Sequence, residues 1–420
     1  MRRSIKLLSL LMALIMVLFS VFSVSAGGAK EDSKPAEFKM GFMTSLSGSF
    51  AAVGETQKKG TLLAAEEVNA KGGLDMPWGK VKIETLVKDD EAKLDVGVRR
   101  FRELVGAGIN GLTGTVWNPM SAAINEETKI APLPYLAGNV PALDSFRKGN
   151  PAVGTFSVAF TPWSIGYLAG ASAIQELGAK KIFFVSRADS WGSTIFEGLK
   201  AAIAEHGGEV VGFAEYPLGT VDFSSAINKA LEIKPDVFMA CQFGGDAIAI
   251  FKQAYDMGLH KQSKMFNTWT TNVVGKGIPS DALKELYALN FYYYNLEGFG
   301  NPELEKKAKA YTEAHMKMWN EPPDAYGTIS YMAAKMIFES VEKAGTFDPV
   351  AVAKVMKETT FDTVKGKMKF REDQQLVGDY LAFIVKGKSK DEMKDPNDVF
   401  KVIGSFGGES ALPSLKSLGY

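Results

Sequence analysis

Hydrophobic and polar positions along this chain follow two alternating periods, beginning at about residue 38. Short apolar runs typical of buried strands are each followed by a stretch in which apolar residues recur every three or four positions, as on one face of a helix. The first set of predicted strands covers 38–43, 80–87, 111–116 and 133–136, with predicted helices at 54–70, 94–105 and 122–128. Strands that alternate with helices in this way predict a parallel sheet with helices on both faces.

The same alternation starts again at about residue 165. The second set of predicted strands covers 181–186, 209–216, 237–241 and 265–268, with predicted helices at 165–177, 194–205, 224–232 and 247–257. Two more helices are predicted at 302–319 and 325–343. The predicted fold class is therefore α/β, with two doubly wound parallel-sheet lobes.

Three extended segments, at 155–160, 289–295 and 368–370, separate the two sets of elements. A single link would let two lobes tumble independently, whereas three links restrict them to opening and closing about one axis. A three-segment hinge is therefore predicted between the lobes. The predicted boundaries are 37–157 plus 297–366 for the first lobe, and 161–294 plus 370–420 for the second.

The N-terminal residues resemble an export signal. Arg2, Arg3 and Lys6 precede an apolar run over 7–22, and small residues suited to signal peptidase follow at 24–26. The run is shorter than the roughly 20 residues that a membrane-spanning helix needs, which favours cleavage over the alternative of an uncleaved anchor. We therefore predict a signal peptide over 1–26, then a disordered leader over 27–36. No Cys follows the run to receive a lipid anchor.

Composition and motifs exclude several classes of protein. The 420 residues hold one Cys, three His, and 48 basic against 48 acidic side chains. A lone Cys241 forms neither an internal disulfide nor a thiolate metal cage, and zero net charge argues against a nucleic-acid partner. The glycines at 106–111 match a dinucleotide-binding spacing, but a helix precedes them and a strand follows, the reverse of the order needed. No cofactor or metal site is predicted, and without hydrolase or P-loop motifs an enzyme is the weaker class.

Four of the six tryptophans follow extended segments of the predicted fold. The predicted strand ends place them in loops, where doubly wound sheets bind ligands, and the four are Trp117, Trp163, Trp191 and Trp269. Together they predict an aromatic-lined cleft, although each one alone is equally compatible with ordinary loop packing. Nearby polar and small residues suit a carboxylate, namely Thr115, Asn118, Ser121, Ala137 and Asn139. Each of these also suits an ordinary cap or turn.

Several segments, taken in order, resemble the type I solute-binding proteins of branched-chain amino acid ABC importers. They include KMGFMTSLSGSFAAVGETQKKGTLLAAEEVNAKGGL, VKDDEAKLDVGVRRFRELV, APLPYLAGNVPAL, KKIFFVSRADSWGSTIFEGLKAAIAEHGGEVVG, DFSSAINKALEIKPDVFMAC and KGKMKF. The resemblance runs from about residue 38 to about residue 386. It implies a ligand site between the lobes, formed by Asn118, Ala137 and Asn139 for the carboxylate, and by Trp191, Gln242, Phe243, Trp269 and Thr270 from the second lobe.

The chain departs from that family at two places in the implied site. Where members that bind α-amino acids place an acidic residue for the ammonium group, this chain has Pro162-Trp163 and Trp269-Thr270. Asn118 and Pro119 also replace the small hydroxyl residues usual in the carboxylate site. The departures predict a hydrophobic or aromatic carboxylate or an amide as ligand, with a branched-chain amino acid as the alternative.

The resemblance also implies a location and partners. It implies a periplasmic, monomeric protein that captures a small organic solute and delivers it to the permease subunits of an ABC importer. No nucleic acid or cofactor is expected. Two alternatives stay open from the sequence, a sensor subunit that presents the closed lobes to a membrane receptor, and an enzyme that uses the same cleft.

Overall fold

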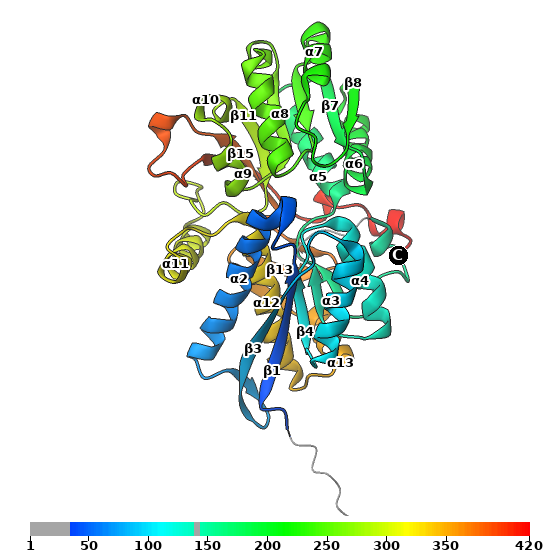
Figure 1. Ribbon diagram of the computed structural model, residues 1–420, viewed down its shortest axis with the longest axis vertical. Helices are drawn as coiled ribbons and strands as arrows, with labels where there is room; N and C mark the ends of the chain where they lie inside the picture. The colour runs from blue at the N-terminus through cyan, green and yellow to red at the C-terminus, as the bar shows by residue number, and fades with distance from the viewer. Residues whose placement is uncertain (1–33, 138–142) are drawn as a thin grey trace, which may run out of the picture. The chain divides into compact units, whose positions relative to one another are not determined.

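The structure, a computed structural model, describes residues 34–137 and 143–420. The predicted signal peptide over 1–26, residues 27–33 of the predicted leader, and Asn139 lie outside the described residues. The described part of the chain contains two large sheets and one small sheet, together with the helices that pack on them (Figure 1). None of its helices is both long enough and apolar enough to cross a membrane.

The first sheet has six strands, and all neighbours pair in parallel except the pair at one edge. In spatial order its strands are β2 (Leu74–Met76), β3 (Gly79–Asp89), β1 (Glu37–Thr44), β4 (Gly111–Gly114), β5 (Tyr135–Ala137) and β6 (Thr155–Ser157). Only β2 and β3 are antiparallel, as a hairpin. The register places Phe38 beside Ile83 and Met40 beside Gly111, so the strand ends that precede the loops share one edge.

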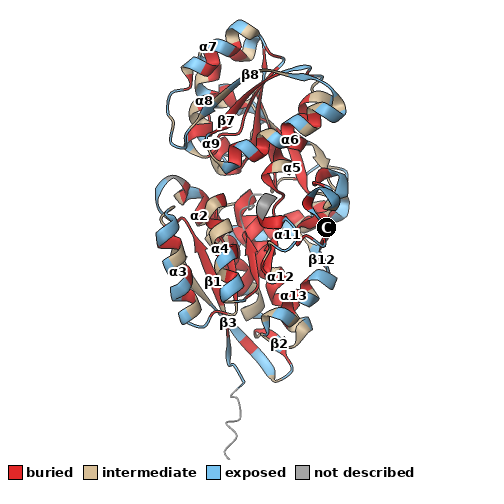
Figure 2. Ribbon diagram, turned by 90° about the vertical axis from the view of Figure 1, so that its right-hand side faces the viewer, coloured by how far each residue is buried: buried red, intermediate tan, exposed pale blue. Residues whose placement is uncertain are grey.

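Helices cover both faces of the first sheet. They are α2 (Ala51–Ala70), α3 (Leu94–Gly106), α4 (Asn118–Ile130), α11 (Pro302–Trp319), α12 (Ala325–Ala344) and α13 (Pro349–Glu358). Along β1 the side chains alternate between the faces. Phe38 packs against Phe338 of α12, whereas Met43 belongs to a separate apolar cluster with Phe101 and Leu104 of α3. Because both faces are covered there, β4, β5 and β6 are buried throughout, whereas β3 alternates between buried and more exposed positions (Figure 2).

The pair α2 and α12 is closely packed, because two glycines remove the side chains at the contact. A Cβ added to Gly60 would lie 1.9 Å from the backbone oxygen of Gly327. Glycine therefore lets the two helix backbones approach, and α2 and α12 run side by side (Figure 1).

The second sheet has seven strands. In spatial order they are β16 (Phe400–Phe406), β15 (Ala382–Gly387), β11 (Leu286–Asn290), β10 (Lys264–Thr270), β9 (Val237–Ala240), β7 (Lys181–Arg187) and β8 (Glu209–Tyr216). The strands from β11 to β8 are parallel, and β15 and β16 add to the edge in antiparallel fashion. The helices of this part are α5 (Pro162–Ala171), α6 (Ser190–His206), α7 (Ser224–Ile233), α8 (Gly245–Asp256), α9 (Asn272–Gly277) and α10 (Ser280–Leu283).

Three crossings join the two parts, after β6, after β11 and before β15. A small antiparallel sheet precedes the last crossing, with strands β12 (Thr360–Thr363), β13 (Gly366–Phe370) and β14 (Leu376–Gly378). Gln375 ties the first crossing to the third, because its Nε2 donates to the Ala159 oxygen at 2.9 Å. Lys365 ties the second to the third, because its Nζ donates to the Leu381 oxygen at 2.7 Å and also to the Phe291 oxygen. Burial lowers the pKa of Lys365 well below its usual value.

The predicted α/β class, with two doubly wound lobes and a three-segment hinge, is confirmed. The helix-then-strand order at 106–111 is also as predicted, since α3 ends at Gly106 and β4 begins at Gly111. The sequence analysis missed the antiparallel strands β2, β15 and β16. β2 is short and β16 has a mixed pattern, whereas β15 is a buried apolar run that was left unassigned. Several helices also begin earlier than predicted, α4 at Asn118 and α6 at Ser190.

Candidate functional site

A small cavity lies where strand ends of both sheets meet. It has a volume of about 10 Å³, and its walls are Phe50, Val116, Trp117, Arg187, Trp191, Phe243 and Tyr326. Val116 and Trp117 follow β4, Arg187 ends β7, and Phe243 follows β9. Four of the seven wall residues therefore lie at or just after the carboxyl ends of parallel strands, the position at which open α/β sheets bind ligands. We call this space the cleft cavity.

Arg187 is the charged residue in the wall of the cleft cavity. Its side chain is 4% exposed, and its Nε donates to Asp189 Oδ2 at 2.8 Å. Within residues 34–137 and 143–420, no acceptor is found for its terminal nitrogens. The guanidinium carbon lies 5.3 Å from the centre of the Trp191 ring, a cation–π distance. The arrangement leaves the planar fork of a guanidinium available to an anion.

Trp191 is held in place by hydrogen bonds at both ends. Its indole Nε1 donates to the Cys241 oxygen at 3.1 Å, which ties it to the chain just after β9. Its backbone nitrogen donates at 3.0 Å to Asp189 Oδ1, because the Asp189 carboxylate caps the start of α6. Asp189 thus positions both the guanidinium and the indole. Cys241 itself is buried, and burial raises the pKa of its thiol to about 12.

Asn118 connects the two parts of the chain directly beside the cavity. It is the first residue of α4, and its Nδ2 donates to Ser190 Oγ at 3.2 Å, at the start of α6. Its Oδ1 is buried and has no hydrogen-bond partner among the described residues. An unpaired buried amide oxygen is costly, so this atom is suited to accept from a bound molecule.

Tyr326 and Asp324 bring the start of α12 to the same place. Asp324 caps α12, and its Oδ1 accepts from the Tyr326 nitrogen at 3.1 Å. Its Oδ2 accepts from the Val273 nitrogen at 3.3 Å, at the start of α9 beside the second sheet. Burial raises the pKa of the Asp324 carboxyl to about 6, although the backbone donors act in the opposite direction.

The structure brings some of the predicted site residues together and leaves others apart. Trp117, Trp191 and Phe243 line the cleft cavity, and Asn118 adjoins it. Trp269 is buried behind that wall, with its ring 5.9 Å from that of Tyr326. Ala137 and Thr270 are buried at the ends of β5 and β10, and Gln242 is buried beside Phe243. Asn139 lies outside the described residues.

Trp163 lies on α5 and stacks on Tyr167, at 5.1 Å between ring centres, and is not a wall residue of the cleft cavity. The expectation that the tryptophans occupy loops was wrong for three of them. Trp163 and Trp191 belong to the first turns of α5 and α6, and Trp269 belongs to β10. The sequence reasoning missed helix starts that were capped by Thr161 and Asp189.

Arg187, Tyr326 and Phe50 were also missed by sequence reasoning. A signal for Arg187 was present, because a charged residue ends the otherwise apolar strand KIFFVSR. Nothing local distinguished Tyr326 or Phe50, which reach the cavity from elements far away in the sequence.

Comparison with known proteins places the chain among binding proteins of this architecture. Residues 37–391 match the family model described as periplasmic binding protein. The chain belongs to the periplasmic binding protein family. A curated relative, Leu/Ile/Val-binding protein homolog 7 of Brucella abortus (strain 2308), is 24% identical over 376 residues, which are 86% of this chain and 91% of the relative.

Solved structures agree on the fold of this periplasmic binding protein. The amino acid ABC transporter substrate-binding protein of Pseudomonas fluorescens Pf-5 superposes with a TM-score of 0.82 at 23% identity, over 92% of this chain and 99% of the other. A solute-binding protein of an ABC transporter from R. palustris, in complex with benzoate, gives 0.75 at 21%, over 90% and 99%. The predicted family and type I fold are therefore confirmed, and the roles of the individual site residues stay predictions.

Proposed function

We propose that this periplasmic binding protein serves an ABC importer and captures an aromatic carboxylate in the cleft cavity. The single observation that carries the proposal is the buried Arg187 guanidinium, which faces the cavity among aromatic rings. Guanidinium binds carboxylate through two parallel hydrogen bonds, and in a desolvated site such bonds are strong. The rings of Trp117, Trp191, Phe243 and Tyr326 would enclose the apolar part of the ligand.

The lining also argues against an α-amino acid. None of the described wall residues is acidic, and Asp189 is already paired with Arg187. An α-ammonium group would therefore enter the cavity beside a cation and without a carboxylate partner, which is costly. That one structural relative was solved with benzoate supports the choice of an aromatic carboxylate.

The remaining parts of the proposal follow from the family. The lobes would comprise 37–157 plus 297–366 and 161–294 plus 370–420, and a ligand that contacts both would select the closed form. Cleavage after Ala26 would release an unlipidated protein to the periplasm, where it would deliver its solute to permease subunits as a monomer. We assign no catalysis, because the one thiol is buried and its pKa is raised to about 12.

Calorimetric titration of the mature protein tests this function, after unfolding and refolding to remove retained solute. Four probes are compared, namely benzoate, phenylacetate, benzamide and leucine. We expect one of the two carboxylates to bind most tightly and benzamide to bind more weakly than benzoate, because benzamide lacks the charge. Binding by leucine alone would overturn the proposed ligand class, and turnover of a bound carboxylate would overturn the assignment as a binding protein.

Closure is tested on the same samples. Small-angle scattering should show a smaller radius of gyration with the bound carboxylate. The free energy of unfolding should rise by about 2.7 kcal/mol at a ligand concentration one hundred times Kd. A ligand that binds at micromolar Kd and changes neither quantity would contradict closure on binding.

A further inference from the structure

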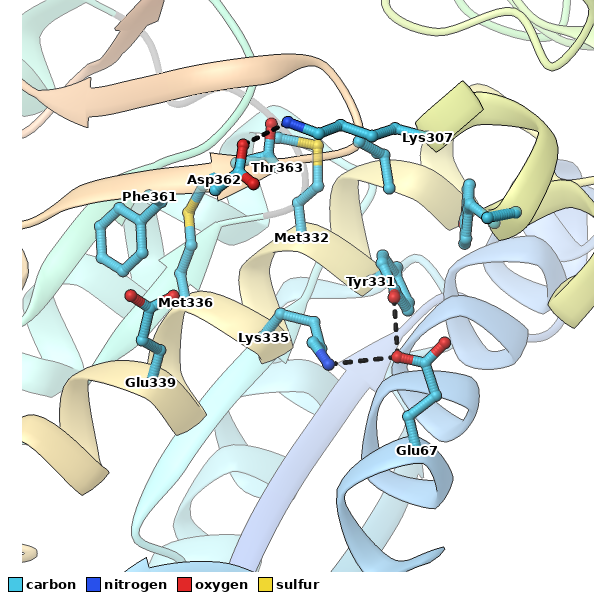
Figure 3. A pocket seen from close by; sticks show the side chains of 13 residues that line it. Glu67, Lys307, Tyr331, Met332, Lys335, Met336, Glu339, Phe361, Asp362 and Thr363 are labelled. Atoms are coloured by element: carbon cyan, nitrogen blue, oxygen red, sulfur yellow. Dashed lines mark hydrogen bonds and ion pairs between the residues drawn. The ribbon is translucent and has the colours of Figure 1, made fainter. Parts of the chain in front are cut away.

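A second cavity of about 300 Å³ lies along α12, on the part of the helix beyond its contact with the cleft cavity (Figure 3). Its floor is apolar and buried, and consists of Tyr311 from α11, Tyr331, Met332 and Met336 from α12, and Phe361 from β12. It shares no wall residue with the cleft cavity. We call it the α12 pocket.

The size and surface of the α12 pocket suit a bicyclic aromatic molecule. A cavity of about 150 Å³ is known to hold benzene, and ligand pockets begin at about 300 Å³. The rings of Tyr311 and Tyr331 lie 4.5 Å apart by their centres, inclined by 33°, so that the two rings pack on each other in the lining. Met332 and Met336 line the same pocket, and methionine side chains are flexible and polarisable, so they adapt to a flat ligand.

Charges at the rim of the pocket decide the sign of the ligand. Glu67 accepts from the Tyr331 hydroxyl at 2.8 Å and from Lys335 Nζ at 3.1 Å, and Figure 3 shows the three side chains meeting at one carboxylate oxygen. Lys307, which also lines the pocket, forms ion pairs with Glu303, at 2.9 Å, and with Asp362. Both lysines that line the pocket are therefore already paired.

The rim carries more carboxylates than ammonium groups. Glu339 also lines the pocket and pairs with Lys343 at 2.7 Å. The lining of the pocket thus contains three carboxylates, of Glu67, Glu339 and Asp362, against two lysines, Lys307 and Lys335. An anion would meet no unpaired lysine there, whereas an ammonium group would meet surplus carboxylate and tyrosine rings.

We propose that the α12 pocket is a second ligand site, which binds an aromatic organic cation of about two fused rings. The inference does not rest on the function proposed for the cleft cavity. Tyr326, in the first turn of α12, lines the cleft cavity, while Tyr331, Met332 and Met336 line the pocket further along the same helix. The test therefore needs a readout specific to the pocket.

Methionine methyl groups provide that readout. The mature protein is labelled with [methyl-13C]methionine, and the resonances of Met332 and Met336 are assigned with the variants Met332→Leu and Met336→Leu. Tryptamine, indole and indole-3-acetate are titrated as probes that share one ring system and differ in charge. We expect saturable shifts at both methyl groups, with tryptamine binding about 3- to 30-fold more tightly than indole, and indole-3-acetate most weakly.

Variants of the rim carboxylates test the charge argument. Glu67→Gln should weaken tryptamine and strengthen indole-3-acetate, because it leaves Lys335 without its partner. Glu339→Gln, at a more exposed position, gives the same direction with less risk to folding. Glu297→Gln removes a carboxylate from an exposed ion pair with Lys394 and should change none of the three titrations.

Several results would overturn the proposal. They are the absence of saturable shifts at Met332 and Met336 with millimolar tryptamine, equal affinity for the three probes, or tightest binding by indole-3-acetate. Displacement of tryptamine by saturating benzoate would show that the shifts report the cleft cavity, and would also overturn it. Failure of benzoate to bind at all would contradict the proposed function and leave the titrations of the α12 pocket unaffected.

Discussion

The α12 pocket is the larger of the two cavities, whereas the cleft cavity is the one whose cationic group has donors available to a ligand. The α12 pocket has about 300 Å³ of free volume against about 10 Å³ in the cleft cavity. Its lining lysines are all paired, whereas the guanidinium of Arg187 in the cleft cavity keeps its terminal nitrogens without an acceptor among the described residues. Volume alone would select the α12 pocket as the main site, and only the strand-end position and the unpaired donors favour the cleft cavity.

The difference follows from how each cavity is built. Residues at strand ends of two sheets and in the first turns of α6 and α12 form the cleft cavity, so its volume depends on how the two parts of the chain close. Helix faces and one strand of a single part form the α12 pocket, and the close contact between Gly60 and Gly327 fixes two of its helices against each other. A small volume in a hinged site is therefore compatible with ligand binding, while the α12 pocket must already have the size of its ligand.

The largest expected effect concerns Arg187. Its absence would contradict the view that unpaired donors distinguish the cleft cavity from the α12 pocket. Arg187→Gln should weaken benzoate by about 2–5 kcal/mol, roughly 30- to 5,000-fold, because it removes one partner of a buried charge pair. The measurement is calorimetric titration. Arg102→Gln is the matched control, since Arg102 pairs with Glu127 at 2.8 Å on the surface and should leave Kd unchanged. If Arg187→Gln keeps its affinity for benzoate within threefold of the wild type, the carboxylate does not bind at Arg187.

A second prediction concerns stability near the cleft cavity, at Asp324. Its carboxyl ionises near pH 3.8 when unfolded and near 6 when folded, so the folded protein holds an extra proton between these values. Stability from this group is therefore present below about pH 4 and is lost as pH rises through about 6, to a total of about 3 kcal/mol. Asp324→Asn should abolish that part of the pH dependence.

Urea unfolding from pH 4 to pH 7 measures the effect of Asp324. The difference in the free energy of unfolding between the wild type and Asp324→Asn should fall as pH rises. Parallel curves for the two proteins would show that the backbone donors at Tyr326 and Val273 outweigh burial. The carboxylates that line the α12 pocket differ from that of Asp324, because they are paired with lysines and partly exposed.

Much of the fold could be predicted from the sequence, because each buried strand and each amphipathic helix carries its own local pattern. The edge strands β2 and β16 could not, since edge positions need neither a full apolar run nor strict alternation. β15 lies inside the sheet and its sequence AFIVKG is an apolar run, so this strand had a local signal that the sequence analysis did not use. Helix starts were also placed too late. The caps of α5 and α6, Thr161 and Asp189, begin helices with residues that were assigned to loops.

The site could be predicted only in part, for a different reason. Trp117, Trp191 and Phe243 follow or adjoin strand ends, so topology alone brings them to one edge. Tyr326 begins a helix that is distant in sequence, and its place in the wall depends on the packing of α12 against α2. The α12 pocket gave no sequence signal at all, because its methionines and tyrosines are spaced like an ordinary core face.

Variants of Trp191 and Trp163 distinguish the cleft cavity found in the structure from the larger cleft of four tryptophans predicted from the sequence. Trp191→Ala should weaken benzoate by about 1.5–3 kcal/mol, roughly ten- to a hundredfold, through lost apolar area. Trp163→Ala truncates the same residue type outside the wall of the cleft cavity and should have little effect. Circular dichroism checks that both variants fold. Equal losses would favour the larger predicted cleft over the cleft cavity.

The smallest expected effect lies at the hydrogen bond from Asn118 to Ser190, which joins α4 of the first part to α6 of the second. Asn118→Ala should weaken benzoate by about 0.5–1.5 kcal/mol, the range for a neutral hydrogen bond. Ser190→Ala is the matched variant on the other side. If both act through this one bond, the double variant should lose no more than either single variant. Additive losses would instead indicate that the Asn118 Nδ2 donates to the carboxylate of the ligand itself. The affinity of the α12 pocket for tryptamine should be unchanged in all three variants, because neither Asn118 nor Ser190 lines that pocket.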